Sequence, residues 1–201
     1  MASKEDIRSS RRLYRRGLTT EQVAQAGESI VRHGLDWAAQ VSGGSNAAFA
    51  IYVGVSHEPP TMPLIAGLHN SGHQVLLPVC EPGRRLSWVY WTPETAFVRS
   101  EYAPIDEPEG ERLDSAVVSA VAGIFMPATA VDLDGNRIGQ GGGYYDRLLQ
   151  YLDASGGRPP TIAVVYDDDV LPSGAIPAEP FDRPVPDALT PSGIVKLGRG
   201  N

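Results

Sequence analysis

The sequence contains a single cysteine, Cys80, so no disulfide bond can form within the chain. Structural disulfides are typical of oxidising compartments, and having none is consistent with a reducing cytoplasm. The sequence also has no stretch that approaches the roughly 20 apolar residues of a membrane-spanning helix, and its N-terminus lacks the apolar core of a signal peptide. We therefore expect a cytoplasmic protein with no membrane partner.

Positive charge is also scarce. The chain has 17 Lys and Arg residues against 24 Asp and Glu residues, which gives a formal net charge of −7. This excess of negative charge argues against nucleic acid as a general partner. Cysteine and histidine show no zinc-like spacing. An anionic ligand would therefore need a local cluster of basic residues.

The composition is that of an ordinary globular protein. Apolar residues make up 42% of the 201 residues, and apolar runs recur between the 22 glycines and 17 prolines. The length fits one domain with a sizeable core, so we expect a single domain over residues 1–201. No internal repeat is present.

Apolar patterns predict strands that alternate with helices. The expected strands cover residues 47–53, 73–79, 86–92, 121–126, 161–166 and 194–197. The expected helices cover residues 3–17, 19–41 and 62–70, with a further helix that begins near Tyr144. Strands that are apolar on both faces are typical of a buried parallel sheet. The pattern predicts an α/β fold, a three-layer sandwich with a mainly parallel central sheet flanked by helices on both faces.

The most informative stretch covers residues 132–147, with five glycines followed by Tyr144, Tyr145, Asp146 and Arg147. An apolar run precedes it and a helical pattern follows it. The glycines are therefore expected between a strand and the N-terminus of a helix, where free backbone N–H groups and the helix dipole favour an anion.

Two standard phosphate-binding motifs do not fit this stretch. It has no Gly-Lys-Ser/Thr, and the third glycine of the dinucleotide fingerprint is replaced by Tyr144. A hairpin with no ligand is the alternative, because Asp134 and Gly135 favour a turn and residues 137–138 could begin a return strand. However, Arg137 and Arg147 bracket the glycines and Asp146 begins the helix, a combination that suits a phosphate with Mg²⁺.

At this point the chain resembles a known family. The run Gly-Asn-Arg-Ile-Gly-Gln-Gly-Gly-Gly-Tyr-Tyr-Asp-Arg, residues 135–147, is similar to the signature of 5-formyltetrahydrofolate cyclo-ligase, also called 5,10-methenyltetrahydrofolate synthetase. The resemblance extends from Lys4 to Thr190. It implies the same three-layer α/β fold, with a Lys-x-x-x-Arg helix at the start of the chain that contacts ATP, and Lys4 and Arg8 match that spacing.

The resemblance also implies two acidic site residues outside the glycine-rich stretch. Glu58 follows the expected strand 47–53, where a glutamate of the family contacts the folate substrate, and Thr61 keeps the family spacing although two prolines intervene. Asp182 matches an aspartate that helps to hold Mg²⁺. The family often has histidine before that aspartate, whereas this chain has Phe181, which puts any role of the histidine in doubt.

The implied reaction is the ATP-dependent conversion of 5-formyltetrahydrofolate to 5,10-methenyltetrahydrofolate with release of ADP and phosphate. The formyl oxygen attacks the γ-phosphate, and N10 then closes the ring. The implied partners are ATP, Mg²⁺ and the folate, and we expect a monomer. The implied site residues divide by role: catalytic Asp146 and Arg147; ATP-binding Lys4, Arg8, Arg137, Gly139, Gly141, Gly142, Gly143, Tyr144 and Tyr145; substrate-binding Glu58, Tyr144 and Tyr145; Mg²⁺-binding Asp146 and Asp182.

Several features remain open in the sequence. The other N-terminal arginines are expected to be solvated, as are the consecutive aspartates 167–169 at a strand end. Glu107 and Asp187 have no assigned role. Two other functions are consistent with an α/β scaffold: binding of folate or ATP without turnover, and chemistry on a sugar phosphate or an acyl group.

Overall fold

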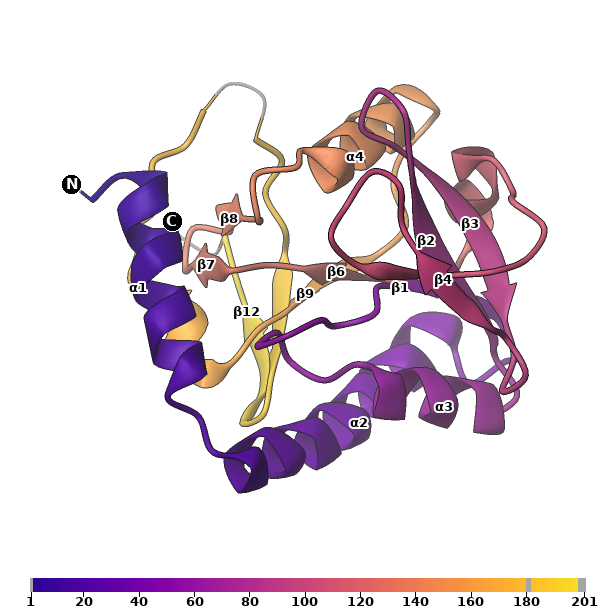
Figure 1. Ribbon diagram of the computed structural model, residues 1–201, viewed down its shortest axis with the longest axis horizontal. Helices are drawn as coiled ribbons and strands as arrows, with labels where there is room; N and C mark the ends of the chain where they lie inside the picture. The colour runs from indigo at the N-terminus through magenta and orange to yellow at the C-terminus, as the bar shows by residue number, and fades with distance from the viewer. Residues whose placement is uncertain (1, 180–181, 199–201) are drawn as a thin grey trace.

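Figure 1 shows the computed structural model, which describes residues 2–179 and 182–198. Phe181, singled out above, lies outside the described residues. A seven-stranded sheet forms the centre, in the order β12, β11, β9, β6, β1, β2, β3. The strands are β1 (Ala48–Ile51), β2 (Gln74–Glu81), β3 (Arg85–Trp91), β6 (Gly123–Pro127), β9 (Thr161–Val164), β11 (Asp187–Thr190) and β12 (Gly193–Lys196).

The five inner strands of this sheet are parallel, and only the edge strands β3 and β12 are antiparallel to their neighbours. Antiparallel edges follow from short turns: β2 and β3 are joined by a tight connection, whereas parallel neighbours need a crossover. The predicted mainly parallel sheet is therefore confirmed.

Helices cover both faces of the sheet (Figure 1). On one face α2 (Thr20–Ser42) and α3 (Met62–Asn70) pack over Phe49 and Phe125. On the other face lies α4 (Tyr144–Ala154), whose leucines pack over inward-facing sheet residues. Gly123 is needed in β6 because a Cβ there would lie 2.6 Å from the Trp37 ring of α2. The layers are those of the predicted sandwich.

The ends of α2 follow its local sequence. The Thr19 side chain accepts a hydrogen bond from the Gln22 backbone N–H, and the Gln22 side chain accepts one from the Thr19 backbone N–H. This is the capping box expected from the sequence. Gly43 ends the helix in a left-handed conformation, with φ of 62°. No helix in the described ranges is long and apolar enough to cross a membrane.

Two small sheets and two 3-10 turns complete the fold. The first sheet has the order β10 (Val170–Leu171), β7 (Ala130–Asp132), β8 (Arg137–Ile138), and the second pairs β4 (Phe97–Arg99) with β5 (Asp106–Pro108). The 3-10 turns are η1 (Ser115–Ala120) and η2 (Asp167–Asp169). β7 and β8 form an antiparallel hairpin. The hairpin alternative is thus correct for residues 130–138, and the glycine-rich loop runs on from it to α4.

Helix α1 (Lys4–Arg16) stands at the side of the sheet near η2 (Figure 1). Its apolar contact with the body is small: Ile7 packs with Ala130, Ile138 and Ile176. Most of the remaining attachment is polar and comes from basic side chains. The placement of α1 therefore depends on charge as much as on apolar burial.

Candidate functional site

A cavity of about 870 Å³ opens beyond the carboxyl ends of β1, β2 and β6. Ligands of open α/β sheets bind at this edge. Most of its lining comes from five segments: α1, residues 52–58, residues 102–108, the glycine-rich loop with the start of α4, and the chain around Asp182. The volume lies near the upper end of the range for small-molecule sites.

The glycine-rich loop forms one wall, and Gly139, Gly141, Gly142 and Gly143 all line the cavity. Gly141 and Gly143 have φ of 96° and 71°, which is the left-handed region that favours glycine. Gly143 is the N-cap of α4 and has no capping side chain. The free N–H groups of the first helical turn are therefore left for a ligand.

Arg137 and Asp146 meet beside this loop. Arg137 Nη2 donates to Asp146 Oδ1 at 2.6 Å, and Arg137 Nη1 donates to the carbonyl of Pro127. The Arg137 side chain is buried, and its Nε has no hydrogen-bond partner among the described residues. A buried guanidinium N–H without a partner suits an anionic ligand.

Lys4 and Asp182 also line the cavity, and their side chains form an ion pair. Lys4 Nζ lies 2.7 Å from Asp182 Oδ2 and 2.8 Å from Glu179 Oε2. Burial lowers the pKa of Lys4, but its hydrogen bonds to the two carboxylates outweigh burial, so that the pKa is raised. The lysine therefore carries its positive charge at neutral pH.

Helix α1 presents more positive charge to the cavity than the sequence interpretation assigned to it. Arg12, Arg15 and Arg16 line the cavity together with Lys4 and Arg8. The expectation that these arginines are simply solvated is wrong for Arg15, which is buried. Lys4, Arg8, Arg12 and Arg16 recur every four residues and so share one helical face, a signal that the sequence already contained.

Arg8 joins α1 to the glycine-rich loop. Its Nε donates to the carbonyl of Gly139 at 2.9 Å, and its Nη1 pairs with Glu5 at 3.2 Å. Arg12 donates to the side-chain oxygen of Gln140 at 3.3 Å. The predicted Lys4 and Arg8 pair is therefore brought to the predicted glycine loop.

Arg15 and Asp169 form a buried ion pair under α1. Arg15 Nη2 lies 2.8 Å from Asp169 Oδ2 and also donates to the carbonyls of Ala128 and Thr129. Asp169 is fully buried, so the expectation of a solvated turn is wrong for it, although Asp167 and Asp168 are exposed. Burial raises the pKa of Asp169, and Arg15 opposes this.

Glu58 lines the cavity next to the glycine-rich loop. Its Oε2 accepts from the backbone N–H of Val55 at 3.2 Å, and its Oε1 accepts from Gln140 at 3.3 Å. Burial raises the pKa of Glu58, while these hydrogen bonds and the Arg15 charge act to lower it. Gln140, which sequence reasoning missed, therefore links Glu58 to the glycine-rich loop.

The backbone of the loop that carries Glu58 is fixed by Thr61. The Thr61 hydroxyl donates to the carbonyl of Tyr52 at 2.7 Å and accepts from the N–H of Gly54 at 2.8 Å. A Cβ on Gly54 would lie 2.3 Å from the carbonyl oxygen of Pro59, so only glycine fits. Tyr52 lines the cavity but stands at the end of an apolar run, and no sequence signal marked it.

Tyr144 and Tyr145 line the cavity as predicted, beside Cys80. Burial raises the pKa of Tyr145, whose hydroxyl has no hydrogen-bond partner within the described ranges. The backbone N–H of Cys80 donates to Glu107 Oε1 at 2.6 Å. Glu107 is therefore a buried support that ties β5 to β2 under the tyrosines.

Arg147 differs from the other predicted site residues. Its side chain is exposed and does not line the cavity, although it follows Asp146 directly. Because consecutive residues of a helix point in different directions, Asp146 and Arg147 do not share a face. The geometry therefore gives the predicted catalytic role of Arg147 no support.

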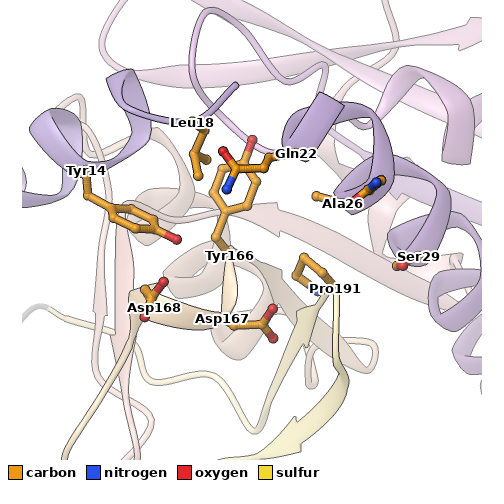
Figure 2. A pocket seen from close by; sticks show the side chains of 10 residues that line it. Tyr14, Leu18, Gln22, Ala26, Ser29, Tyr166, Asp167, Asp168 and Pro191 are labelled. Carbon is orange, nitrogen blue, oxygen red and sulfur yellow. The ribbon is translucent and has the colours of Figure 1, made fainter. Parts of the chain in front are cut away.

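A smaller hollow of about 300 Å³ lies outside the main cavity, between α1, α2 and η2 (Figure 2). A hydrogen bond to Asp168 and burial raise the pKa of Tyr14 to about 12. Asp167 accepts from the N–H of Ser192. These two aspartates therefore anchor neighbouring segments, and Asp187 similarly pairs with Lys196 of β12.

Two carboxylates of the cavity could contribute to a Mg²⁺ site. Asp146 and Asp182 both line the cavity, but no cluster of three or more His, Cys, Asp or Glu residues occurs in the part of the chain that the structure describes. Mg²⁺ is usually held by one or two carboxylates, waters and the phosphates of a substrate. Two carboxylates beside a cationic wall suit such an ion when it arrives with a nucleotide.

Comparison with known proteins gives one consistent match. The chain matches the 5-formyltetrahydrofolate cyclo-ligase family over residues 1–191. It is 34% identical over 201 residues to 5-formyltetrahydrofolate cyclo-ligase of Mycolicibacterium smegmatis, covering 97% of each chain. It is 31% identical over 185 residues to the Escherichia coli K12 protein of the same name, covering 91% of this chain and 97% of the relative.

Solved structures agree in fold. An NMR structure of Aquifex aeolicus 5,10-methenyltetrahydrofolate synthetase has a TM-score of 0.75 and 25% sequence identity, and covers 98% of this chain and 94% of that chain. A synthetase from Mycoplasma pneumoniae has a TM-score of 0.70 at 17% identity, covering 94% of this chain and 98% of that chain. The latter similarity is one of fold alone.

Proposed function

Because the chain belongs to the 5-formyltetrahydrofolate cyclo-ligase family, we propose that it uses ATP and Mg²⁺ to convert 5-formyltetrahydrofolate to 5,10-methenyltetrahydrofolate. Family membership establishes the enzyme class and the folate reaction. The use of ATP and Mg²⁺ and the residue roles are proposals. One observation supports them: a single cavity is lined by basic side chains, by the Glu58 carboxylate and by two tyrosines.

The nucleotide belongs on the wall formed by α1 and the glycine-rich loop. Lys4, Arg8 and Arg137 supply positive charge there, and the N-terminus of α4 supplies free backbone N–H groups. A triphosphate needs both kinds of partner, because its charge is spread over many oxygens. The unpartnered Nε of Arg137 is one donor held ready for a phosphate oxygen.

Asp146 and Asp182 are the residues that would hold Mg²⁺. Each already has a basic neighbour, Arg137 for Asp146 and Lys4 for Asp182. When bound, the ion would neutralise charge that develops on the transferring phosphoryl group. The two carboxylates would therefore orient the nucleotide through the ion, while the basic side chains contact the phosphates directly.

The folate belongs on the adjoining wall. Glu58 supplies a half-buried carboxylate that can bond to the polar edge of a pterin ring, and Tyr144 and Tyr145 supply aromatic surface. The link from Gln140 to Glu58 places this wall next to the glycine-rich loop. A formyl group on the bound folate would then face the γ-phosphate.

In the proposed reaction the formyl oxygen forms a bond to the γ-phosphorus as the bond to ADP breaks. N10 of the folate next attacks the activated formyl carbon and loses its proton to solvent, and the carbon–oxygen bond breaks with departure of phosphate. The nucleophiles belong to the substrate, so the protein needs no nucleophilic side chain. Its residues position two ligands and stabilise negative charge, which is the usual protein contribution to phosphoryl transfer.

A steady-state assay tests this function. Protein, 5-formyltetrahydrofolate, ATP and Mg²⁺ are mixed, and methenyl absorbance and ADP are followed together. We expect one ADP for each methenyl product. For Arg8→Ala we expect an ATP KM raised about tenfold or more, because a charged hydrogen-bond donor is lost. The exposed Arg32→Ala on α2 is the matched control. ADP without methenyl product, or neither product, would contradict the proposal.

A further inference from the structure

Tyr52 has a buried hydroxyl with no hydrogen-bond partner in the described part of the chain. The residue follows β1 directly, is 4% exposed, and lines the main cavity. Buried hydroxyls in proteins are nearly always bonded, so an exception calls for a physical reason. In a ligand cavity, the simplest reason is a partner that the ligand brings.

The position of this side chain is fixed from the backbone side. Thr61 bonds to the carbonyl of Tyr52 and to the N–H of Gly54, and Gly54 has no room for a Cβ against Pro59. Because Thr61 is fully buried and bonds to both backbone groups, the main chain at Tyr52 is fixed. The Tyr52 side chain is itself 4% exposed, so packing limits its movement before any ligand binds.

The surroundings of the hydroxyl place it at the Glu58 end of the cavity. Burial raises the pKa of Tyr52 well above its usual range, and the Glu58 charge raises it further. Arg15, Tyr145 and Tyr166 are its other electrostatic neighbours, and none of them bonds to the hydroxyl. A neutral O–H beside a buried carboxylate can both donate to and accept from a ring edge.

We propose that the Tyr52 hydroxyl is a specificity residue that hydrogen-bonds the polar edge of the substrate's heterocyclic ring. This inference rests on the proposed folate function and extends it to a residue outside the predicted site. No group in the described part of the chain bonds to the hydroxyl, and the ring nitrogen or carbonyl of the bound substrate supplies its partner. The hydroxyl therefore discriminates between substrates, because a ring that lacks this polar atom leaves the hydroxyl unpaired and binds more weakly.

The test uses Tyr52→Phe, which removes only the hydroxyl. We expect the KM for 5-formyltetrahydrofolate to rise about 3- to 10-fold, the range for one net hydrogen bond, with the ATP KM unchanged. The free variant should unfold at the same temperature as the wild type or up to about 4 °C higher, because a buried unpaired group is gone. The shift in unfolding temperature caused by 5-formyltetrahydrofolate should be smaller than in the wild type.

Tyr90→Phe is the matched control, because Tyr90 is a half-exposed tyrosine of β3 outside the cavity. If Tyr52→Phe gives the folate KM and the ligand-induced shift of this control, the inference is wrong. A lower unfolding temperature of the free variant would also overturn it, because the hydroxyl would then have a partner without ligand. If the wild type itself is neither stabilised by nor active on the folate, the proposed function fails instead.

Discussion

The buried pair of Arg15 and Asp169 gives the most quantitative prediction about stability. Arg15 also binds the carbonyls of Ala128 and Thr129, so a single guanidinium connects α1 to the segment after β6 and to η2. Replacing Arg15 by Met removes all of these bonds and leaves the Asp169 carboxylate buried without its cation. Breaking a buried pair in this way costs about 3–5 kcal/mol.

For a chain of this length each kcal/mol corresponds to about 2–4 °C in unfolding temperature. Arg15→Met should therefore lower the midpoint by about 6–20 °C, measured by circular dichroism at neutral pH. The matched control is Arg99→Met, because Arg99 pairs with Asp106 on the surface, where an ion pair contributes about 0–1 kcal/mol.

A double variant separates the ion pair from the loss of packing. Arg15→Met combined with Asp169→Asn should be more stable than Arg15→Met alone, because no unpaired charge is then buried. Equal midpoints for Arg15→Met and Arg99→Met would refute the reasoning. A double variant that is no more stable than Arg15→Met alone would also refute it.

Two further predictions concern titratable groups of the cavity. The folded-state pKa of Glu58 is raised above its ordinary value of 4.5, so the stability that its protonated form contributes is present below that pH and is lost as the pH rises through the folded pKa. The free energy of unfolding of Glu58→Gln, measured in urea, should therefore rise relative to that of the wild type as the pH goes from 4 to 8. The exposed Glu28→Gln should show no such rise. A difference between Glu58→Gln and wild type that shrinks with increasing pH would contradict the prediction. Burial, with the hydrogen bond to Glu107, raises the pKa of the Cys80 thiol to about 12, so alkylation by iodoacetamide at pH 8 should be about a hundredfold or more slower in folded than in urea-unfolded protein. Equal alkylation rates in folded and unfolded protein would contradict this, because the folded thiol would then be as ionised and as accessible as in the unfolded chain.

The fold was largely predictable because its signals are local. Continuous apolar runs at 47–53 and 161–166 indicated strands buried on both faces, and they became β1 and β9 of the parallel sheet. The Thr19 and Gln22 cap is likewise a relation between residues three apart. The short strands β4 and β5 were not predicted, because three residues carry too little periodicity to distinguish a strand from a loop.

The sequence motif marked several residues that the structure brings together. Gly139 and Gly141–Gly143, Asp146, the two tyrosines, Lys4 and Arg8 all line one cavity, and their roles in it stay predictions. The four-residue spacing that continues from Lys4 and Arg8 would also have found Arg12 and Arg16. These two arginines were missed because the spacing was not followed beyond Arg8, although the sequence contained it.

Other site features depend on contacts between distant parts of the chain. Asp167, Asp168 and Asp169 are chemically identical neighbours, and only the last is buried, because Arg15 meets it from α1. Nothing local in the sequence distinguishes them. Tyr52 is similar, since an aromatic residue at a strand end is ordinary core until the cavity beside it is seen.

The central claim is that ATP activates the formyl oxygen of the substrate, and an isotope experiment tests it most directly. 5-Formyltetrahydrofolate carrying a heavy oxygen in its formyl group is converted by the wild-type protein with ATP and Mg²⁺, and the released phosphate is analysed by mass spectrometry. The account predicts that one heavy oxygen appears in the phosphate for each methenyl product. Methenyl product formed with unlabelled phosphate would contradict it, because the formyl oxygen would then have left without being phosphorylated.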